Sequence, residues 1–387
     1  MKRMLSLALA LMLILSLAAC AGDPQTASPD PSPSTASTPS QEEIDALNEK
    51  YGLERPQNTA SAAGDSAETY TLTVGQMGTG IKAAMVVLAH EMGYYEEEGL
   101  SVELSQISNL NDGLTAITLG KLDVLPFGVI PTCTFVSQGA DLTVIGGTIA
   151  EGSACVALPE REAEFQELKG FEGKTVACVR PETGHMIMKD QMRRAGVDMD
   201  TVTFTELDGF QSVVEAVLKG AADVGFVNSG FEQNAETQGL VVPFFVGDYA
   251  PNAVCCRQTT SGAVIAEKRP ALVRFEIANL RAMKLMYDDP DTTIAKLAAF
   301  SGQSEDYVRY CIYDGCMKIS MDPSLNRVVD FYNVMKANGD IDASAPDNMD
   351  GHVDPSIYLD ALSIVLERYP DDAHLQDMMS QYSVNNE

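Results

Sequence analysis

Apolar residues recur along the chain with two periods, one of two residues and one of three to four residues. The shorter period is typical of half-buried strands, and the longer one is typical of amphipathic helices. Before residue 69 the pattern is weak: residues 41–52 carry a faint helical signal, and residues 53–68 form a second loose segment. We therefore expect ordered structure to begin near Tyr70.

From Tyr70 onward the pattern predicts strands that alternate with helices. The expected strands are 69–75, 100–104, 122–128 and 142–149, and the expected helices are 81–93, 110–119 and 131–138. The order then restarts, with strands at 174–179, 202–207, 222–227 and 240–246 and helices at 184–195, 210–218 and 231–238. Strands separated by such helices form right-handed βαβ units. The sequence predicts an α/β protein of two similar lobes, each a mostly parallel sheet with helices on both faces.

Each predicted lobe contains a Gly-x-x-Asp-Val motif, at Gly120 and again at Gly220. The glycine ends a helix, where positive φ is favourable, and the aspartate leads into a buried strand. We expect Asp123 and Asp223 to form turns rather than to catalyse a reaction. Ligands of open parallel sheets collect beyond the carboxyl ends of the strands. That rule makes Gly128, Val129, Asn228 and Ser229 candidate binding residues.

The N-terminal residues have the pattern of a secretion signal. A short basic start precedes an apolar run at residues 5–17, and the sequence LAAC ends at Cys20. The run is shorter than the roughly 20 residues that span a bilayer. LAAC resembles the bacterial lipobox, which predicts a lipoprotein signal peptide at 1–19 and a lipid on Cys20; an ordinary signal peptide with an incidental cysteine is the alternative. Residues 20–68, rich in Pro, Ser, Thr and Ala at their start, then read as a disordered tether with a short helical segment.

The net charge and the cysteine and histidine content indicate which kinds of partner and ligand the protein is expected to bind. The formal net charge is −29, which disfavours nucleic acid and anionic lipid, so membrane attachment is expected through the lipid alone. Seven cysteines follow Cys20, and most are expected to be buried thiols. Cys255 and Cys256 are adjacent, and in a strand their side chains would point to opposite faces. Cys311 and Cys316 either bridge a turn or stay as thiols. The four histidines show no ligand spacing, so we expect no metal and no cofactor.

Several ordered motifs resemble the solute-binding proteins of ABC importers for nitrate, sulfonate, taurine and pyrimidine thiamin precursors. They are MGYYEEEGL at 92–100, GKLDVLPFG at 120–128, FEGKTV at 171–176 and GAADVGFVN at 220–228. The resemblance, which covers about residues 70–338, implies a two-lobed periplasmic-binding-protein fold of type II. It places lobe one at 69–158 plus 250–387 and lobe two at 159–249, with crossings near 157–160 and 247–254. A strand and long helix at 262–289 and helices at 290–299, 305–313, 325–337 and 357–368 would complete lobe one.

The resemblance also implies a set of cleft residues. The turn 77–80 precedes a helix, so its N–H groups are expected to face the cleft, with Met77 and Thr79 as binding residues. Glu182 and His185 replace small residues of the sulfonate-binding relatives, which favours a neutral or cationic nitrogen compound; Glu182 pointing to solvent is the alternative. The remaining expected cleft residues are Asn109, Asn111, Ser153, Thr183, Gly184, Asp248 and Asn252.

The resemblance and the residues together predict an extracytoplasmic solute-binding lipoprotein rather than an enzyme. Its partners would be a small-molecule solute, an ABC permease with its ATPase, and the membrane through Cys20. The expected solute is a nitrogen- or sulfur-containing organic compound such as a pyrimidine thiamin precursor, with sulfonate, taurine or nitrate as alternatives. A pyrimidine-forming enzyme of the same superfamily is the competing class, but its longer cysteine-rich motif is missing and no catalytic triad motif is present. A receptor that presents the solute to another membrane protein remains a third class.

Overall fold

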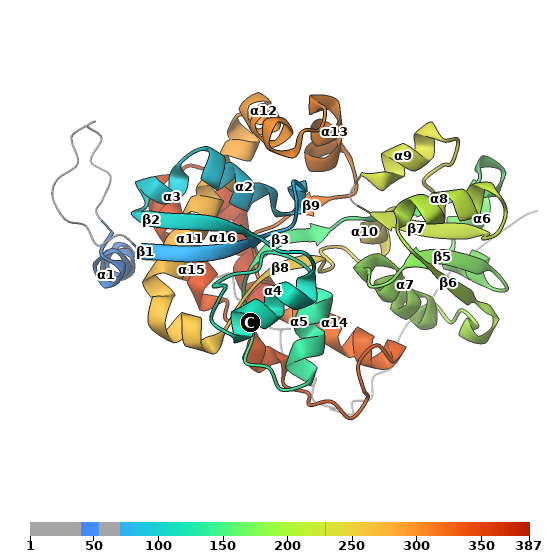
Figure 1. The fold of residues 1–387 in the computed structure, drawn as a ribbon, viewed down its shortest axis with the longest axis horizontal. Helices are drawn as coiled ribbons and strands as arrows, with labels where there is room; N and C mark the ends of the chain where they lie inside the picture. Colours follow the sequence, from blue (N-terminus) through green and yellow to red (C-terminus); the bar gives the residue numbers. More distant parts are fainter. Residues whose placement is uncertain (1–39, 54–69, 229) are drawn as a thin grey trace, which may run out of the picture. The chain divides into compact units, whose positions relative to one another are not determined.

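The computed structural model of the protein describes residues 40–53, 70–228 and 230–387 (Figure 1). The predicted signal peptide, the lipidation site Cys20, the start of the tether and Ser229 lie outside these residues. The helices of the described part are α1 Gln41–Tyr51, α2 Ala84–Glu91, α3 Tyr94–Glu97, α4 Leu110–Thr118, α5 Val129–Ser137, α6 Glu162–Phe165, α7 Thr183–Arg194, α8 Phe210–Leu218, α9 Phe231–Thr237, α10 Val246–Tyr249, α11 Gly262–Asp288, α12 Pro290–Ser301, α13 Glu305–Arg309, α14 Leu325–Asn338, α15 Ser356–Arg368 and α16 Ala373–Asn386.

The strands form three sheets, one parallel, one antiparallel and one mixed. They are β1 Tyr70–Gln76, β2 Leu100–Gln106, β3 Thr143–Glu151, β4 Ser153–Val156, β5 Thr175–Val179, β6 Thr203–Leu207, β7 Val224–Asn228, β8 Cys256–Thr260 and β9 Lys318–Ile319. The sheet orders are β1-β2, β8-β3-β9 and β4-β7-β5-β6. The predicted parallel pairing holds for β1 with β2 and for β5 with β6 and β7. By contrast, β3 pairs antiparallel with β8 and β9, and β4 pairs antiparallel with β7.

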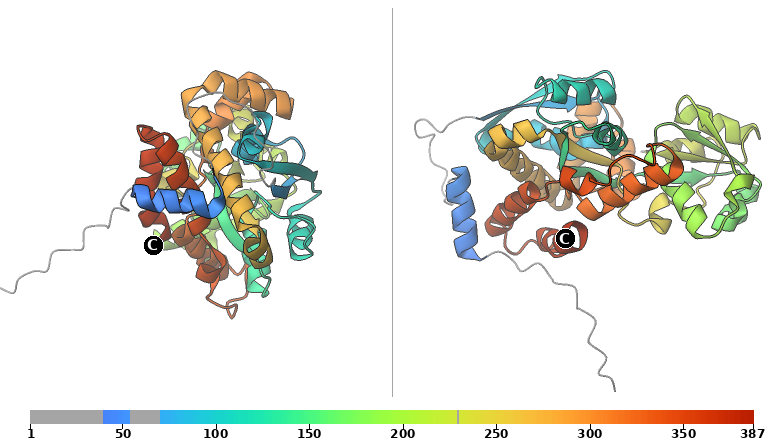
Figure 2. Two further views of the ribbon diagram at one scale, coloured as in Figure 1. Left: turned by 90° about the vertical axis from the view of Figure 1, so that its left-hand side faces the viewer. Right: turned by 90° about the horizontal axis from the view of Figure 1, so that it is seen from below.

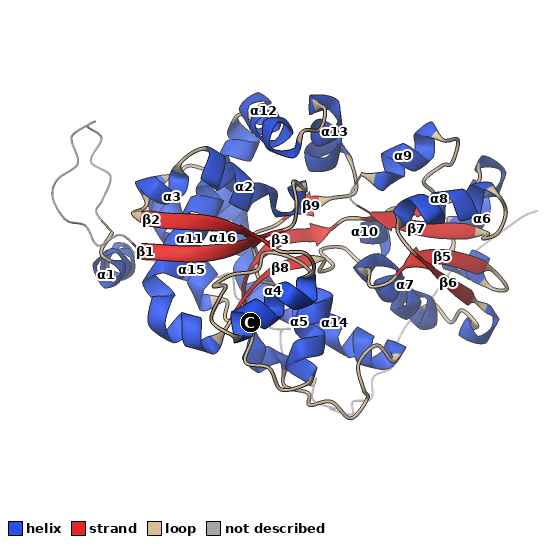
Figure 3. Ribbon diagram, viewed as in Figure 1, coloured by secondary structure: helices blue, strands red, loops and turns tan. Residues whose placement is uncertain are grey.

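Two lobes follow from this sheet arrangement. The second lobe is the sheet β4-β7-β5-β6 with helices on both of its sides, and the first lobe holds the other two sheets with the long helix α11 (Figure 3). The α/β fold class predicted from the sequence is confirmed. The expected lobe boundary at 158/159 would leave β4 in the first lobe, but β4 pairs with β7 of the second.

The first lobe is built around α11. Fourteen of its residues are buried, and the helix packs against α2, α15 and α3. Pro270 interrupts the helix, and Lys268 just before it has non-helical φ and ψ angles. No helix in the described ranges is both long and apolar enough to cross a membrane.

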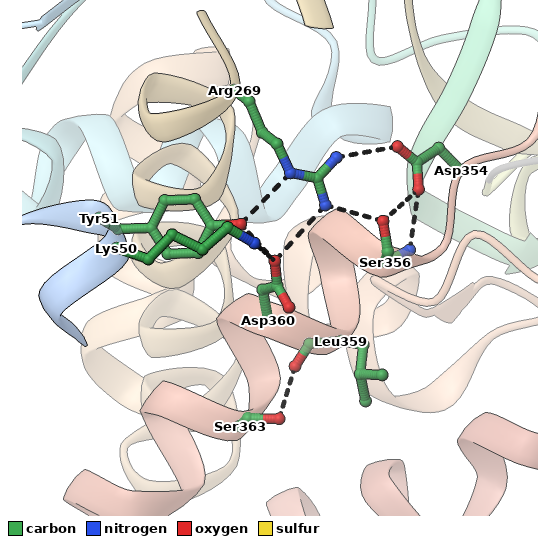
Figure 4. Close-up of polar contacts among 8 residues, drawn as sticks. All are labelled: Lys50, Tyr51, Arg269, Asp354, Ser356, Leu359, Asp360 and Ser363. Atoms are coloured by element: carbon green, nitrogen blue, oxygen red, sulfur yellow. Dashed lines mark hydrogen bonds and ion pairs between the residues drawn. The ribbon is translucent and has the colours of Figure 1, made fainter. Parts of the chain in front are cut away.

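Helix α1 lies across α15 (Figure 2). Its C-terminal residues Lys50 and Tyr51 meet Asp360, and the Arg269 guanidinium donates to the Tyr51 hydroxyl at 3.2 Å and to Asp354 at 3.1 Å (Figure 4). Ser40 and Glu43 cap the start of the helix reciprocally. The faint helical pattern before Tyr70 therefore marks a real helix that is attached to the first lobe.

The two Gly-x-x-Asp-Val motifs have the same geometry. Asp123 donates its N–H to Thr73 O at 2.8 Å and accepts from Thr73 N at 2.8 Å through its carboxylate. Asp223 makes the same two bonds to Thr175, at 2.8 and 2.7 Å. Gly120 and Gly220 have φ of 67° and 68°. Each aspartate thus ties the segment after a helix to a strand of its lobe, β1 or β5, which confirms the predicted turn-forming role.

Three predicted strands are wrong, and two of them contain a proline. Residues 122–128 form single bridges, Val124 to Val74 and Leu125 to Thr259, before Pro126 removes the next N–H. Residues 240–246 likewise form bridges at Val241 and Phe245 on either side of Pro243. The strand expected at the start of 262–289 is instead β8, immediately upstream, and residues from Gly262 are helical. Helix α16 was not predicted.

Candidate functional site

A cavity of about 330 Å³ is walled by both lobes. The first lobe supplies the turn before α2, the segment before and at the start of α5, and the segment leading into β8. The second lobe supplies the start of α7 and the end of β7. Most of the wall is apolar, with side chains that include Met77, Leu110, Phe127, Ile130, Pro131 and Pro181. A concave, largely apolar site with a few convergent polar groups is typical of small-molecule binding.

Lys82 and Asn228 join the two lobes at this cavity. Lys82 belongs to the 3-10 turn Ile81–Ala83 of the first lobe, and its Nζ donates to Asn228 Oδ1 at 3.3 Å. Asn228 ends β7 in the second lobe, and its Nδ2 donates to Glu182 Oε1 at 3.2 Å. A cation from one lobe is therefore linked through an amide to an anion of the other.

Glu182 is a buried carboxylate that caps α7. It accepts hydrogen bonds from the backbone N–H of Gly184 at 2.8 Å and of His185 at 3.0 Å, and from the Ser153 hydroxyl at 2.5 Å. Burial alone would raise its pKa, but the His185 ring and these donors outweigh that effect and hold the pKa of Glu182 at about 2. The side chain therefore points into the protein, not to solvent, and remains ionised at neutral pH.

Close packing explains why residue 184 is a glycine. A Cβ atom at Gly184 would lie 2.3 Å from the Ser153 Cβ, so any larger residue would push β4 away from α7. The register pairs Ser153 directly with Asn228. These contacts hold Ser153, Glu182 and Asn228 as one polar group at the base of the cavity.

Cys255 and Cys256 also line the cavity. Their Sγ atoms lie 3.7 Å apart. The sequence-based expectation that they face opposite ways is wrong, because β8 begins only at Cys256 and Cys255 precedes the strand. The Cys255 thiol and Lys82 lower the pKa of Cys256 to about 6 against the effect of burial. Cys311 and Cys316, by contrast, are not bridged to each other, and Cys316 donates to Glu232 at 3.2 Å.

Five of the residues predicted from the sequence line this cavity. They are Met77, Gly128, Glu182, Thr183 and Asn228. Ser153 and Gly184 line a small adjoining hollow, and His185 is buried behind Glu182 with its Nδ1 3.4 Å from Glu182 Oε2.

The other predicted residues that the structure describes lie outside the wall of this cavity, and most of them make contacts elsewhere in the protein. Asn109 caps α4, and Asn111 is exposed on that helix. Thr79 is exposed and Val129 is fully buried, with its N–H bonded to Cys255 O. Asp248 caps the four-residue helix α10 through the N–H of Phe245. Asn252 contacts Glu151 and Lys318. The cavity wall does not include these six residues, and Ser229 lies outside the described residues.

Two N–H groups of the turn 77–80, which the sequence suggested would face a ligand, have partners within the protein, and that of Gly80 bonds to Met77 O at 3.5 Å. The Gly78 N–H is bonded to Gln106 Oε1 at 3.1 Å, and a 3-10 turn separates this segment from α2. The positive group at this edge is the Lys82 ammonium instead. Sequence reasoning missed Lys82, although a single lysine directly after a glycine-rich turn, at the start of an apolar helix, was an available signal.

Two further observations concern other possible sites. A hollow of about 420 Å³ lies between the end of α5 and residues 340–346, entirely within the first lobe. Among the residues that the structure describes, no group of three or more His, Cys, Asp and Glu side chains is placed to hold a metal ion.

The fold and the two-lobed cavity define a periplasmic-binding-protein architecture, and comparisons with known proteins agree. The family model described as NMT1/THI5 like matches residues 81–293, more than half of the chain, and the protein belongs to this family. Among solved structures, the nitrate-binding protein of Synechocystis PCC 6803 superposes with a TM-score of 0.62 at 12% identity, covering 80% of this chain and 92% of that one. The aliphatic sulphonate binding protein of Escherichia coli gives 0.59 at 17% identity, covering 75% and 93%.

The curated relatives are described as enzymes rather than as binding proteins. A 4-amino-5-hydroxymethyl-2-methylpyrimidine phosphate synthase of Candida albicans is 21% identical over 228 residues, which are 56% of this chain and 66% of the relative. The synthase of Aspergillus parasiticus is 25% identical over 142 residues, 37% of this chain and 41% of the relative. The chain thus spans about half the length of the curated relatives it matches. The curated relatives are thus described as enzymes, while several structural neighbours are described as binding proteins or as a binding component of an importer.

Proposed function

We propose that the protein is an extracytoplasmic solute-binding protein of an ABC importer that captures a small nitrogen-containing heterocycle of the pyrimidine type. The observation that carries this proposal is the cavity walled by both lobes, in which Lys82 and Asn228 meet over the buried Glu182. A ligand that contacts both lobes stabilises the conformation in which they are close together. Such a conformation is a suitable signal for a permease.

The charges of the cavity favour a neutral or cationic ligand over an anion. Lys82 offers a donor to a ring nitrogen or carbonyl oxygen, and the apolar wall suits an aromatic ring. The ionised Glu182 lies beside the same cavity and would repel a sulfonate or nitrate, although Lys82 reduces that repulsion. A substituted aminopyrimidine supplies both the ring acceptor and an exocyclic donor.

Membrane attachment and delivery complete the proposal. The LAAC sequence supports a lipid on Cys20, and the following Pro- and Ser-rich segment supports a tether. Solved neighbours that are ligand-binding components of importers, such as the Staphylococcus aureus protein with a TM-score of 0.60 at 14% identity, support a permease and ATPase as partners.

Isothermal titration calorimetry of the purified chain tests the proposal. The ligands are 4-amino-5-hydroxymethyl-2-methylpyrimidine, taurine and nitrate, each titrated into the wild type and into Asn228→Ala. The matched control is Asn333→Ala, which removes an exposed amide of α14. We expect one pyrimidine to bind per chain, with affinity lost in Asn228→Ala and retained in Asn333→Ala.

Other outcomes would contradict defined parts of the proposal. Binding of taurine or nitrate alone would overturn the ligand class, and binding of none of the three with unchanged melting temperatures would overturn the function. Formation of a pyrimidine that was not supplied, detected by mass spectrometry, would instead support the enzyme alternative, because a binding protein forms no new pyrimidine.

A further inference from the structure

We propose that Cys255 and Cys256 form a thiol–disulfide exchange site in the wall of the cavity, which reacts with small organic disulfides and closes to a reversible vicinal disulfide. This site is distinct from solute capture, and its reaction requires no solute. The proposal rests on the placement of the two thiols, on the cation beside them and on the contrast with the other cysteines.

The two sulfur atoms are close to each other and reachable from the cavity. Cys255 Sγ and Cys256 Sγ are 3.7 Å apart, and both residues line the cavity of about 330 Å³. That volume admits a small disulfide. Closing the eight-membered ring requires rotation of both side chains and a local distortion of the peptide between Cys255 and Cys256. Neighbouring Cα atoms are about 3.8 Å apart, less than the usual disulfide span, so the bond is strained and easily reduced.

Cys256 is the nucleophile of the pair. The Lys82 ammonium and the Gly128 backbone lie beside it, and with the Cys255 thiol they lower the pKa of Cys256 to about 6. The thiolate is the reactive form of cysteine. The lowered pKa favours the thiolate form of Cys256, with the shared proton on Cys255, whose pKa is raised.

Other buried cysteines provide the contrast. Burial raises the pKa of Cys133 to about 12 and that of Cys178 to about 11. Neither of them lines the cavity between the lobes. Reactivity is thus expected at one pair among several cysteines, which makes the proposal specific.

The reaction balances as two exchange steps. The Cys256 thiolate attacks a disulfide RSSR, so that a Cys256–S–S–R bond forms and RS⁻ leaves. That RS⁻ takes the proton of Cys255, and the Cys255 thiolate then attacks Cys256 Sγ and expels the second RS⁻. The two cysteine sulfurs are oxidised by two electrons in total, and the small disulfide is reduced to two thiols.

Intact-mass measurement tests the site. The purified chain is incubated with 2-hydroxyethyl disulfide at pH 7 as wild type, Cys255→Ser, Cys256→Ser and the control Cys178→Ser, and peptide mapping locates each modification. The wild type and Cys178→Ser should lose two hydrogen atoms without keeping an adduct. Cys255→Ser should stop at one stable adduct on Cys256, and reaction in Cys256→Ser should be slower by at least about a hundredfold. Dithiothreitol should restore the starting masses.

Two results would overturn the proposal. One is an adduct that accumulates on a cysteine other than Cys256 in Cys255→Ser. The other is an unchanged mass of the wild type after an incubation that fully converts a free cysteine peptide. Neither readout requires a functional Cys256→Ser protein, and neither depends on whether the protein binds a pyrimidine.

Discussion

Lys82 Nζ in the first lobe lies 3.3 Å from Asn228 Oδ1 in the second lobe. This hydrogen bond is made by residues more than 140 positions apart, and it lies at the cavity that both lobes wall. Asn228 in turn donates from Nδ2 to Glu182 Oε1 at 3.2 Å, so the amide connects Lys82 to the buried carboxylate. Under the proposed function, a ligand that enters the cavity must compete with these groups or bind to them.

Replacing Lys82 by methionine is therefore expected to weaken ligand binding. The change keeps the approximate length of the side chain but removes the donor, which corresponds to a loss of about 1–3 kcal/mol, or roughly 5- to 150-fold in affinity. Lys121→Met, which changes an exposed lysine, is the matched control. Calorimetry of Lys82→Met, Asn228→Ala and the double variant should show that the two losses are not additive. Additive losses would mean that the two residues act on the ligand independently.

Glu182 should contribute to acid stability. Its pKa of about 2 in the folded protein lies below its ordinary value of 4.5, so its contribution is complete above about pH 5 and disappears as pH falls toward 2. The wild type should lose roughly 3 kcal/mol of unfolding free energy over this range beyond what Glu182→Gln loses. Urea unfolding at pH 6, 4 and 3 measures this difference. Parallel curves for the two proteins would show that Glu182 is not held ionised.

Glu276 should have the opposite effect on the pH dependence of stability, making the folded protein less stable as the pH rises. It is fully buried in α11, and within the described part of the chain neither carboxylate oxygen has a hydrogen-bond partner. Burial raises its pKa well above 4.5, so folding above that pH requires the side chain to take up a proton. Glu276→Gln should be more stable than the wild type at pH 8, by an advantage that grows by up to about 1.4 kcal/mol per pH unit above 4.5. An advantage equal at pH 4 and pH 8 would contradict a protonated Glu276.

Asp123 and Asp223 should each contribute to stability by the same mechanism. Removing either carboxylate leaves the N–H of Thr73 or Thr175 without its acceptor, at a cost of about 1–3 kcal/mol. Asp208→Ala, at an exposed aspartate, serves as the control. Thermal unfolding of Asp123→Ala and Asp223→Ala should show lower midpoints than the control. A midpoint for either variant equal to that of Asp208→Ala would rule out the shared role.

Much of the fold could be predicted from local pattern, because most elements bury one face and carry the matching period. The match is closest where glycine ends a helix, as at Gly120 and Gly220. The segments that failed, 122–128 and 240–246, have apolar content typical of strands, but each contains a proline that limits it to single bridges. Periodicity reports burial, whereas ladder formation also requires consecutive N–H donors.

The site was predictable only in part, for a different reason. Asn228 and Gly128 follow from the rule that ligands meet the ends of parallel strands, and both line the cavity. Asn109 and Asp248 were expected in the cleft because the resemblance places these loop and crossing positions there, yet each caps a short helix beside it. Lys82 meets Asn228 only where the two lobes come together. Lys82 and the Cys255–Cys256 pair become neighbours through the folding of the first lobe, from segments more than 170 positions apart, and no local pattern encodes either contact.

The position of a bound ligand tests the central claim most directly. A crystal structure of the chain grown with 4-amino-5-hydroxymethyl-2-methylpyrimidine should show the ring in the cavity between the lobes, with an acceptor atom of the pyrimidine within hydrogen-bonding distance of Lys82 Nζ. A pyrimidine found instead in the hollow between α5 and residues 340–346, with the cavity beside Asn228 occupied only by water, would contradict the account.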